Sequence, residues 1–413
     1  MKNTIKTTIL LLLILSTTLL KAQSVRNCGT TEYTNHLINT VPGLSQKYEA
    51  QETAMRNWIN KGVKDNNVII IPVIFHVLYN NNTTNISDAQ IASQIDILNN
   101  DYARQNADTF KTPALFKGVA SSVGIQFCVA HQDPNGNWTN GITRTQTAVT
   151  KFDLKANTAK YTSQGGHDAW NTSLYLNIWV VPEIIVNGMS GILGYAQMPG
   201  GPAATDGVVV GYNYVGNIGT AQYPFNKGRT LTHEVGHYFN LRHIWADDGG
   251  SCSGTDYVTD TPNQSDKNFG CPSHPHKSCS NDGDMFQNFM DYTDDACMNL
   301  FTKGQGERMI AAINTSRASL KTSGMCQANY VKSIEKDLFN ISPNPVTNNL
   351  NISINNNNIS EINILDITGK IVLSTISNKK NISINTSDIK NGVYLIQVKN
   401  ESKVSIKKVI IQH

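Results

Sequence analysis

Hydrophobic residues along the chain follow a pattern that predicts a mixed domain of strands and helices. Residues 67–79 form a near-continuous β-branched run, typical of a strand buried on both faces, and Pro72 predicts a bulge or register break within it. A helix begins at Ser87, and its apolar face continues to Tyr102. Shorter apolar runs predict further strands at 125–130, 174–181, 192–196 and 208–210. We therefore expect an α+β domain that is split by a cleft.

The pattern changes toward the C-terminus. A helix predicted at 305–319 closes the first domain, and residues 327–337 are interpreted as a linker. From residue 338 to 413 the composition shifts to Asn, Ile, Ser and Lys, with turns between short alternating runs. These runs predict strands at 350–354, 362–365, 371–374, 393–398 and 404–411. We expect a small all-β sandwich domain here.

The N-terminal residues predict export. Residues 1–22 have the pattern of a secretory signal peptide, with lysines before an apolar core at 9–20. That core is short for a bilayer span, which needs ~20 apolar residues, and no other stretch approaches that length. Residues 23–66 are polar, with a helical pattern around 46–61, and we interpret them as a pro-segment. The mature domain is then 67–326.

Charge and cysteine content narrow the function. Charged residues make up 16% of the chain and the net charge is +3, so nothing indicates a nucleic-acid partner. Export permits disulfides, and an odd total of seven cysteines leaves at least one thiol without an intramolecular partner. Four cysteines lie within 252–297, where a zinc site is the alternative to disulfides. Its ligands would be Cys271, His274, His276 and Cys279. We favour disulfides, and Cys128 with Cys326 is a further candidate pair.

The stretch from Thr232 to His243 carries the strongest chemical signal. On a helix starting near Gly228, His233 and His237 lie one turn apart and can hold one zinc ion. A third histidine, His243, reaches the metal only if the chain turns after Phe239 or Asn240. Three ligands leave one position for a water, whose pKa zinc lowers to about 7. Glu234 stands beside the first ligand and can take the proton.

Two downstream features fit this reading. Tyr292 can offer its phenol to the oxyanion of a tetrahedral intermediate, and Met290 would pack beneath the metal as an apolar floor. Asp294 and Asp295 follow and can line a pocket for a basic side chain. The alternative for this pair is an exposed acidic turn.

Two other stretches have open interpretations. The loops at 247–250 and 256–262 are rich in oxygen ligands of the kind that Ca²⁺ prefers, although ordinary turn chemistry explains them equally well. Cys28 lies in Arg26-Asn27-Cys28-Gly29, where a thiolate would occupy the open zinc position and keep a zymogen inactive. A lone cysteine with no role is the alternative.

Residues 67–326 resemble the pappalysin family of metzincin metallopeptidases. The resemblance rests on the three-histidine motif with Glu234, on Met290 and Tyr292, and on the stretches 191–196 and 288–298. The usual metzincin pattern has Gly where this chain has Asn240. Asn also adopts the left-handed backbone that the turn requires.

The resemblance implies roles for the catalytic residues. Zinc would be held by His233, His237 and His243, with Glu234 as general base and acid. Tyr292 would stabilise the transition state, and Met290 would be the Met-turn.

It also implies supporting sites. Structural Ca²⁺ would lie near Asp256 and Thr261, Cys28 would be a cysteine switch, and Asp295 would recognise a basic residue just after the scissile bond. The disulfides would be Cys252–Cys279 and Cys271–Cys297.

Residues 338–413 resemble the type A C-terminal sorting domain of the type IX secretion system. The matching stretches are 342–345, 365–370, 391–394 and 407–409. The resemblance implies a Bacteroidota-type cell, the type IX machinery as a partner, and secretion or attachment at the cell surface.

The sequence thus predicts a secreted zinc endopeptidase that is made as a zymogen and prefers Arg or Lys after the cut. One alternative is a catalytically idle metzincin scaffold that serves as a surface adhesin. The intact Glu234 argues against it, because a pure binder needs no base. Another is a zinc amidase or deacetylase that acts on cell-wall material. A cleft that fits an extended peptide would favour the peptidase.

Overall fold

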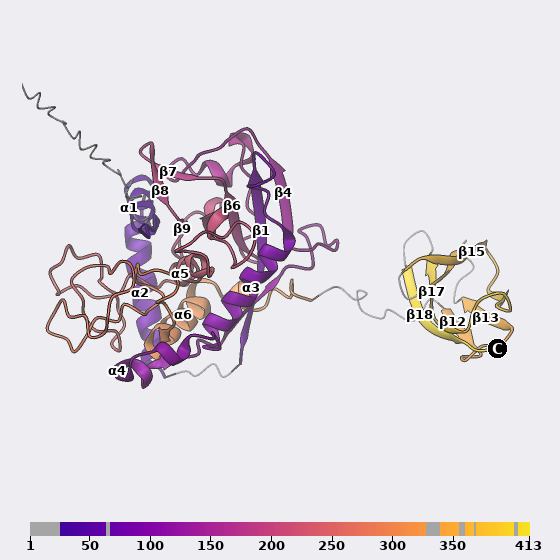
Figure 1. Cartoon of the computed structure of the whole chain (residues 1–413). Helices are drawn as coiled ribbons and strands as arrows, with labels where there is room; N and C mark the ends of the chain where they lie inside the picture. Colours follow the sequence, from indigo (N-terminus) through magenta and orange to yellow (C-terminus); the bar gives the residue numbers. More distant parts are fainter. Residues whose placement is uncertain (1–24, 63–66, 328–338, 355–359, 367–368, 400–403) are drawn as a thin grey trace, which may run out of the picture. The chain divides into compact units, whose positions relative to one another are not determined.

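The computed structural model describes residues 25–62, 67–327, 339–354, 360–366, 369–399 and 404–413 (Figure 1). They belong to two compact units, Met1–Ala328 and Asn329–His413. The predicted signal peptide and nearly all of the predicted linker lie outside the described residues. Within the described residues, no helix has both the length and the hydrophobicity to cross a membrane.

The first unit is built on a six-stranded sheet. Neighbouring strands are parallel except at one edge, where β9 is antiparallel to β10. The order across the sheet is β3 (Ile125–Val129), β1 (Ile69–Tyr79), β6 (Leu176–Val181), β10 (Val208–Gly211) and β9 (Gly194–Ala196), with β4 (Ile142–Gln146) pairing with the second half of β1.

The bulge predicted at Pro72 is wrong. The register of β1 on β3 runs unbroken from Ile69 to Val73, with Pro72 opposite Cys128. Backbone groups of Ile69 and Val73 bond to the β3 side, so Pro72 faces the β6 side by alternation. Pairing with β6 begins only at Val73. The missing amide of Pro72 therefore breaks no ladder.

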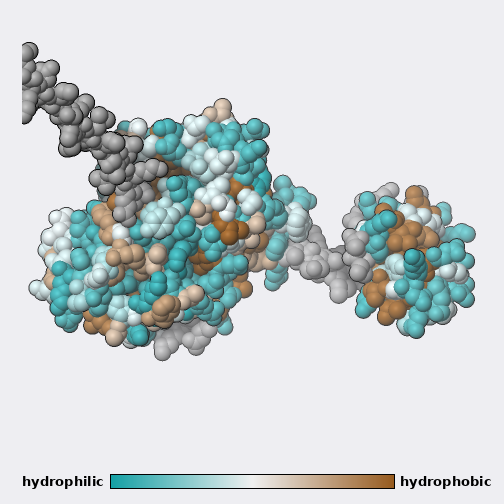
Figure 2. Space-filling view, viewed as in Figure 1, coloured by the Kyte–Doolittle hydropathy of each residue, from teal (hydrophilic) through white to brown (hydrophobic). Residues whose placement is uncertain are grey.

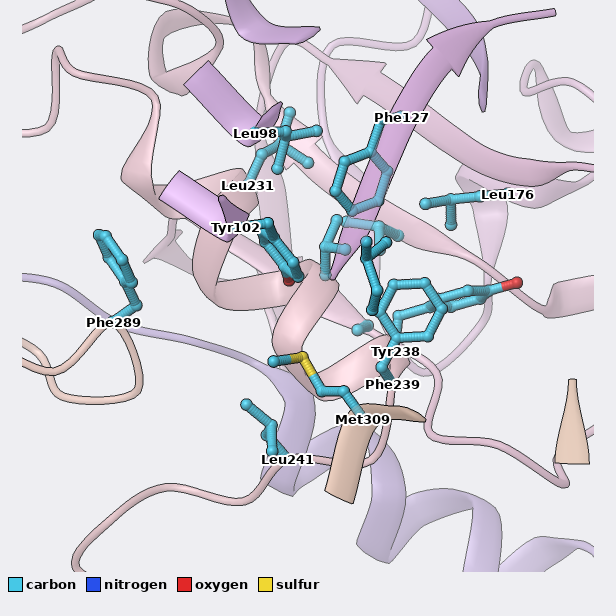
Figure 3. Packing of buried hydrophobic residues seen from close by; sticks show 14 of the residues in the cluster. Leu98, Tyr102, Phe127, Leu176, Leu231, Tyr238, Phe239, Leu241, Phe289 and Met309 are labelled. Carbon is cyan, nitrogen blue, oxygen red and sulfur yellow. The ribbon is translucent and has the colours of Figure 1, made fainter. Parts of the chain in front are cut away.

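Helices cover both faces of the sheet. One face packs on α3 (Asp88–Tyr102) and on α5 (Arg229–Tyr238), all of whose residues are buried. Figure 3 shows Leu98 and Tyr102 of α3 close to Leu231 of α5 in this core. Val208 and Val210 of β10 face this cluster, whereas Val209 faces the other one.

The opposite face is covered in part by N-terminal residues. Helices α1 (Thr30–Thr40) and α2 (Leu44–Asn60) fold onto the unit (Figure 1). Tyr33 and Leu37 of α1 pack against Trp179 and Val209 of the sheet. The sequence pattern had predicted α2 but not α1. The predicted pro-segment is thus an integral layer of this structure.

A long irregular stretch follows α5. Between Phe239 and Leu300 the structure has no helix or strand, and two disulfides connect its loops, Cys252–Cys279 and Cys271–Cys297. These bonds rule out the zinc site considered for Cys271 and Cys279. The third disulfide, Cys128–Cys326, joins β3 to the end of the unit. Short 3-10 helices also occur in this unit, and its remaining α-helices and strands are α4 (Ala114–Lys117), β2 (Ala120–Ser121), β5 (Phe152–Asp153), β7 (Ile184–Val186), β8 (Met189–Ile192), β11 (Phe301–Thr302), α6 (Lys303–Ser316) and α7 (Ala318–Lys321).

The second unit is an antiparallel β sandwich, so the predicted fold class is confirmed for both parts of the chain. Its two sheets enclose an apolar core. In Figure 2 hydrophobic side chains also appear on the visible face of this unit, and Ile371, Val372 and Ile376 are among its exposed residues. The strands are β12 (Phe339–Ser342), β13 (Asn349–Ile354) and β16 (Asn381–Asn385) in one sheet, and β15 (Ile371–Ser377), β14 (Ser360–Leu365), β17 (Gly392–Lys399) and β18 (Val404–Ile411) in the other.

The Cys128–Cys326 bond spans a sequence separation of 198 residues, against 27 for Cys252–Cys279. Replacing both members of the long-range pair with Ser should lower the free energy of unfolding by about 5 kcal/mol, because the crosslink restricts the unfolded chain. The same change in the shorter loop should cost about 3.5 kcal/mol. Denaturant unfolding followed by tryptophan fluorescence measures both. Equal midpoints for both variants and the parent would contradict this expectation.

Candidate active site

Three histidines converge at the C-terminal end of α5. His233 and His237 project from successive turns of the helix, and Asn240 then adopts a left-handed backbone with φ 70°. This turn brings His243 back, so that the Nε2 atom of His237 lies 3.1 Å from those of His233 and His243. All three side chains are buried. The turn predicted after Phe239 or Asn240 is therefore present.

The outer nitrogens of the rings determine what the inner ones can bind. Nδ1–H of His233 donates to Phe289 O at 2.7 Å, and that of His237 donates to Leu241 O at 2.8 Å. His243 donates to the carboxylate of Asp247 at 2.8 Å. Each Nε2 therefore presents a lone pair, and three lone pairs this close need a cation between them. The donor set fits zinc, with neutral imidazoles oriented by their outer partners.

Burial lowers the pKa of His233 and His237 and raises that of the neighbouring Glu234. Burial, followed by the charge of His243, lowers the pKa of His237 to about 3. Burial raises the pKa of Glu234 to about 7. Its Oε2 accepts hydrogen bonds from Cys28 Sγ at 3.3 Å and from Thr30 Oγ1 at 3.0 Å. A carboxylate beside three convergent imidazoles can take and return a proton.

Cys28 completes the cluster. One donor atom each from Cys28, His233, His237 and His243 lie within 4.8 Å of one another. Cys28 is the one free cysteine among the described residues. Burial, and then the negative charge of Glu234, raise the pKa of its thiol. A thiol of the N-terminal segment thus occupies the fourth side of the candidate metal site.

Met290 and Tyr292 approach the histidines from the irregular stretch. Met290 is buried, and its sulfur lies where a side chain at position 236 would be, so Gly236 is required for this contact. The phenol of Tyr292 accepts from Cys28 N at 3.2 Å and donates to Cys28 O at 3.3 Å. The carboxylate of Asp291 accepts from Asn268 N at 2.7 Å. This bond ties the Tyr292 segment to the disulfide-linked loops.

Asp295 lies at the other end of α5. Its Oδ2 accepts from the backbone amides of Lys227 at 2.7 Å and Arg229 at 3.2 Å, so it caps the first turn of the helix. Its Oδ1 accepts from Arg26 Nη2 at 2.5 Å. The neighbouring Asp294 makes no such contact with Arg26.

The Arg26 guanidinium has a separate partner for each nitrogen. Nε donates to Thr293 O at 3.2 Å, and Nη1 donates to Thr230 Oγ1 at 3.1 Å. The group lies 4.9 Å from the ring centroid of Phe225. Sequence reasoning predicted the acidic side of this pocket, but it missed Thr230, Thr293 and Phe225. Their residue types carry no signal of their own.

The same segment pairs with the edge of the sheet. Gly29 N donates to Gly194 O and Leu193 N donates to Asn27 O, both at 2.9 Å. Ala196 N donates to Thr30 Oγ1 at 2.9 Å. Residues 26–28 therefore lie across the histidines, with Cys28 paired in parallel with Gly194 of β9, in the place where a peptide would pair with this strand. Helix α1 begins directly after them, at Thr30.

The predicted calcium residues also lie together. Thr261 Oγ1 donates to Asp256 Oδ2 at 2.8 Å, and both residues are buried. Burial raises the pKa of Asp256 to about 6. The buried oxygens Asp260 Oδ1 and Gln264 Oε1 have no hydrogen-bond partner in the structure. The donor set of this loop is one that a hard cation such as Ca²⁺ suits.

Comparisons with known proteins agree with this geometry. A family model described as pregnancy-associated plasma protein-A matches residues 160–314. An extracellular metalloprotease from Arthroderma benhamiae is 34% identical over 258 residues, which cover 60% of this chain and 79% of the relative. The chain belongs to the pappalysin family of zinc metallopeptidases.

Solved structures from Tannerella forsythia extend the likeness to the pappalysin fold. A promirolysin mutant is 48% identical, with a TM-score of 0.64, over 72% of this chain and 97% of that chain. Mature mirolysin in complex with a cleaved peptide is 52% identical, with a TM-score of 0.58, over 63% and 97%. These matches confirm the predicted pappalysin family and the predicted metalloendopeptidase class. They favour a peptidase over the adhesin and amidase alternatives.

The C-terminal unit has its own match. A model of a secretion system C-terminal sorting domain covers residues 340–412. Together with the extracellular metalloprotease relatives, it confirms that this pappalysin is secreted or attached at the cell surface.

The turn at Asn240 offers a test of how the third ligand is placed. Asn240→Ala should lower zinc affinity roughly tenfold, because an L-residue other than Asn pays 1–2 kcal/mol in the left-handed region, whereas Asn240→Gly should bind as the parent does. Competition with a chelating dye measures the affinity.

Asn187, which has φ 49° in an exposed hairpin, is a matched control for this experiment. Asn187→Ala should lose stability without losing zinc. If Asn240→Ala binds zinc as tightly as Asn240→Gly does, the turn has no role in ligand placement.

Proposed function

We propose that this pappalysin hydrolyses peptide bonds with His233, His237 and His243 as the zinc ligands and Glu234 as general base and acid. One observation carries the proposal. Residues 26–28 cross the histidines along the edge strand β9, where a peptide would lie, and Glu234 Oε2 is within hydrogen-bond distance of the side chains of Cys28 and Thr30.

Zinc, when bound, supplies a Lewis acid that polarises a carbonyl and lowers the pKa of water. The protein supplies the remaining chemistry. Glu234 takes the proton of the attacking water at its carboxylate and passes it to the leaving amine nitrogen. Its burial excludes bulk solvent, so the proton is transferred within the site.

Tyr292 is proposed to stabilise the transition state. Its hydroxyl reaches both backbone polar groups of the residue beside the histidines, namely N and O of Cys28. With substrate in place of Cys28, the phenol can donate to the scissile carbonyl oxygen as negative charge develops there.

Asp295 is proposed to select a basic residue just after the cut. The guanidinium of Arg26 supports this role, because it bonds to Asp295, Thr230 and Thr293 through three different nitrogens. Arg26 precedes Cys28, so residues 26–28 run in the opposite direction to a substrate whose basic residue follows the cut. A lysine ammonium is a single point and cannot reach three acceptors in this fork-like arrangement. We therefore expect Arg to be preferred over Lys.

Residues 23–66 are proposed to keep the enzyme latent. Cys28 would act as the switch at the metal, and Arg26 would fill the Asp295 pocket two residues away. Release of the mature domain, residues 67–326, would free both sites. The chain would lose its signal peptide, residues 1–22, during export. Beyond the linker at 327–337, the sorting domain at 338–413 would engage the type IX secretion machinery.

Calcium is proposed as a structural ion in the loop of Asp256 and Thr261. The unpartnered oxygens of Asp260 and Gln264 and the buried carboxylate of Asp256 support this proposal. The ion would stabilise a stretch that has no helix or strand of its own.

The mechanism and the pocket can be tested with one peptide library. Activated, zinc-loaded enzyme should cleave it with Arg enriched just after the cut. Asp295→Asn should lower kcat/KM for Arg peptides about ten- to hundredfold, since one charged hydrogen bond is lost, while Asp294→Asn serves as the matched control. Glu234→Ala should lower kcat at least about a hundredfold while zinc stays bound. Cleavage that persists in this last variant would contradict Glu234 as the base.

Latency can be tested on the uncleaved chain. Cys28→Ser and Arg26→Ala should each raise the hydrolysis of a fluorogenic peptide by full-length, zinc-loaded protein, because each removes one contact across the site. Thr40→Ala is the control, since its hydroxyl bonds only to His36 O of its own helix. If the Cys28 and Arg26 variants are as inactive as the parent before any chain cleavage, then neither residue maintains latency.

A further inference from the structure

A cavity of about 660 Å³ lies between the pro-segment and the catalytic domain. His237 and His243 line it at the metal site, and Arg242 and Tyr257 line it further away. Helices α1 and α2 close it, and Glu52 of α2 is part of its wall. Arg26 enters the Asp295 pocket before the chain crosses the histidines, so this cavity lies on the other side of the metal site. Removal of the pro-segment would turn it into an open groove.

Glu52 makes a two-pronged ion pair at this wall. Its Oε1 accepts from Arg308 Nη1 at 2.8 Å, and its Oε2 accepts from Arg308 Nη2 at 2.7 Å. Both side chains are buried. Burial raises the pKa of Glu52, but hydrogen bonding and charge from Arg308 outweigh this and lower it overall. The geometry is the one in which Arg binds carboxylates best.

Arg308 is held in place by the catalytic domain, not by Glu52 alone. Its Nε donates to Asn240 O at 2.9 Å, and its guanidinium lies 5.1 Å from the ring centroid of Tyr257. Arg242 lies 4.5 Å from the same centroid. The two arginines therefore flank one aromatic ring that belongs to the mature domain, and these contacts involve no residue of α2.

Loss of the pro-segment would leave this arrangement with excess positive charge. Asp256 is the nearby carboxylate that could take the place of Glu52, and the charge of Arg308 acts to lower its pKa. Its two oxygens, however, already accept hydrogen bonds from Thr261 Oγ1 and Val258 N. The fork of Arg308 would then face the groove without the carboxylate that it holds in the zymogen. A preorganised guanidinium in this position favours binding of another carboxylate.

We propose that Arg308 and Arg242 form a carboxylate-binding subsite of the mature enzyme, which Glu52 occupies in the zymogen. The subsite takes an Asp or Glu side chain of the substrate on the amino-terminal side of the cut. It rests on the proposed function, and it adds an acidic residue before the scissile bond to the basic residue expected after it. The preferred substrate is therefore a peptide with an Asp or Glu residue before the scissile bond and Arg directly after it.

Matched peptides test this subsite in the activated, zinc-loaded enzyme. Each peptide carries Arg after the cut, and a single Glu is moved from the second to the sixth position before it, with Gln in its place as the reference. When Glu stands at one or two neighbouring positions, kcat/KM should be about fivefold higher for the Glu peptide than for the Gln peptide. Most of this difference should come from a lower KM. Added salt of about 0.5 M should reduce this ratio, because a groove open to solvent is screened.

Three variants identify the residues responsible. Arg308→Gln and Arg242→Gln should each bring the Glu-to-Gln ratio close to one. Arg144→Gln, an exposed arginine that pairs with Asp88 elsewhere on the domain, should retain it. Arg308 also supports the turn at Asn240, so circular dichroism is used to check that its variant is folded. Arg242 is exposed, and its variant decides the question if the first one unfolds.

The outcomes separate this proposal from the proposed function. A ratio near one at every position in the parent enzyme overturns the subsite while leaving the peptidase intact. A ratio that survives in both arginine variants overturns it as well. If the parent cleaves neither peptide of any pair, the proposed function fails, and the subsite fails with it.

Discussion

The structure depends on three imidazole nitrogens that must be unprotonated and must converge on one point. Like lone pairs at 3.1 Å repel one another unless a cation lies between them, so the rings have to be held from behind. Two of the supports are backbone carbonyls, from Phe289 and Leu241, and the third is the carboxylate of Asp247. A backbone carbonyl is a support only if its own segment is immobile. The disulfides and the Asp291 bonds in the irregular stretch supply that immobility, since this stretch has no sheet or helix of its own.

The pro-segment uses the same groups as the predicted chemistry. Arg26 bonds to Asp295, Cys28 joins the histidine cluster, and Glu52 bonds to Arg308. These contacts come from two parts of the pro-segment, residues 26–28 and helix α2. Because these contacts are made by one continuous segment, each contact that forms raises the local concentration of the remaining groups at their partners. No single contact therefore has to be strong. The cleavage of residues 23–66 that we propose would weaken all of these contacts together.

Much of the catalytic site could be predicted from sequence because its chemistry needs fixed residue types at fixed spacings. His233, His237 and His243 are an example, and the turn at Asn240 followed from their spacing. Helix α1 was missed, because its buried residues Tyr33 and Leu37 are too few to give a period. Lys160 could not be found by any pattern, since it is fully buried beneath Tyr33 and Tyr195.

The burial of Lys160 can be recognised only in the tertiary structure, because its partners are distant in the sequence. Its Nζ donates to Thr205 O at 2.7 Å, an acceptor 45 residues away in the chain. Burial lowers its pKa to about 7. The pocket residues Thr230 and Thr293 were missed for a similar reason, because an ordinary hydroxyl or carbonyl becomes specific only through its position. Sequence therefore indicates metal ligands better than it indicates the walls of a pocket.

Strand β9 has a consequence for the enzyme after activation. It is the edge of its sheet, and Gly194 O, Leu193 N and Ala196 N are all bonded by residues 27–30 in the zymogen. Unpairing them exposes backbone groups that any extended chain can join, including another copy of the protein. The strand has only three residues, Gly194–Ala196. A template this short binds a peptide when side-chain pockets assist, yet it is too short for stable edge-to-edge pairing between two copies of the domain.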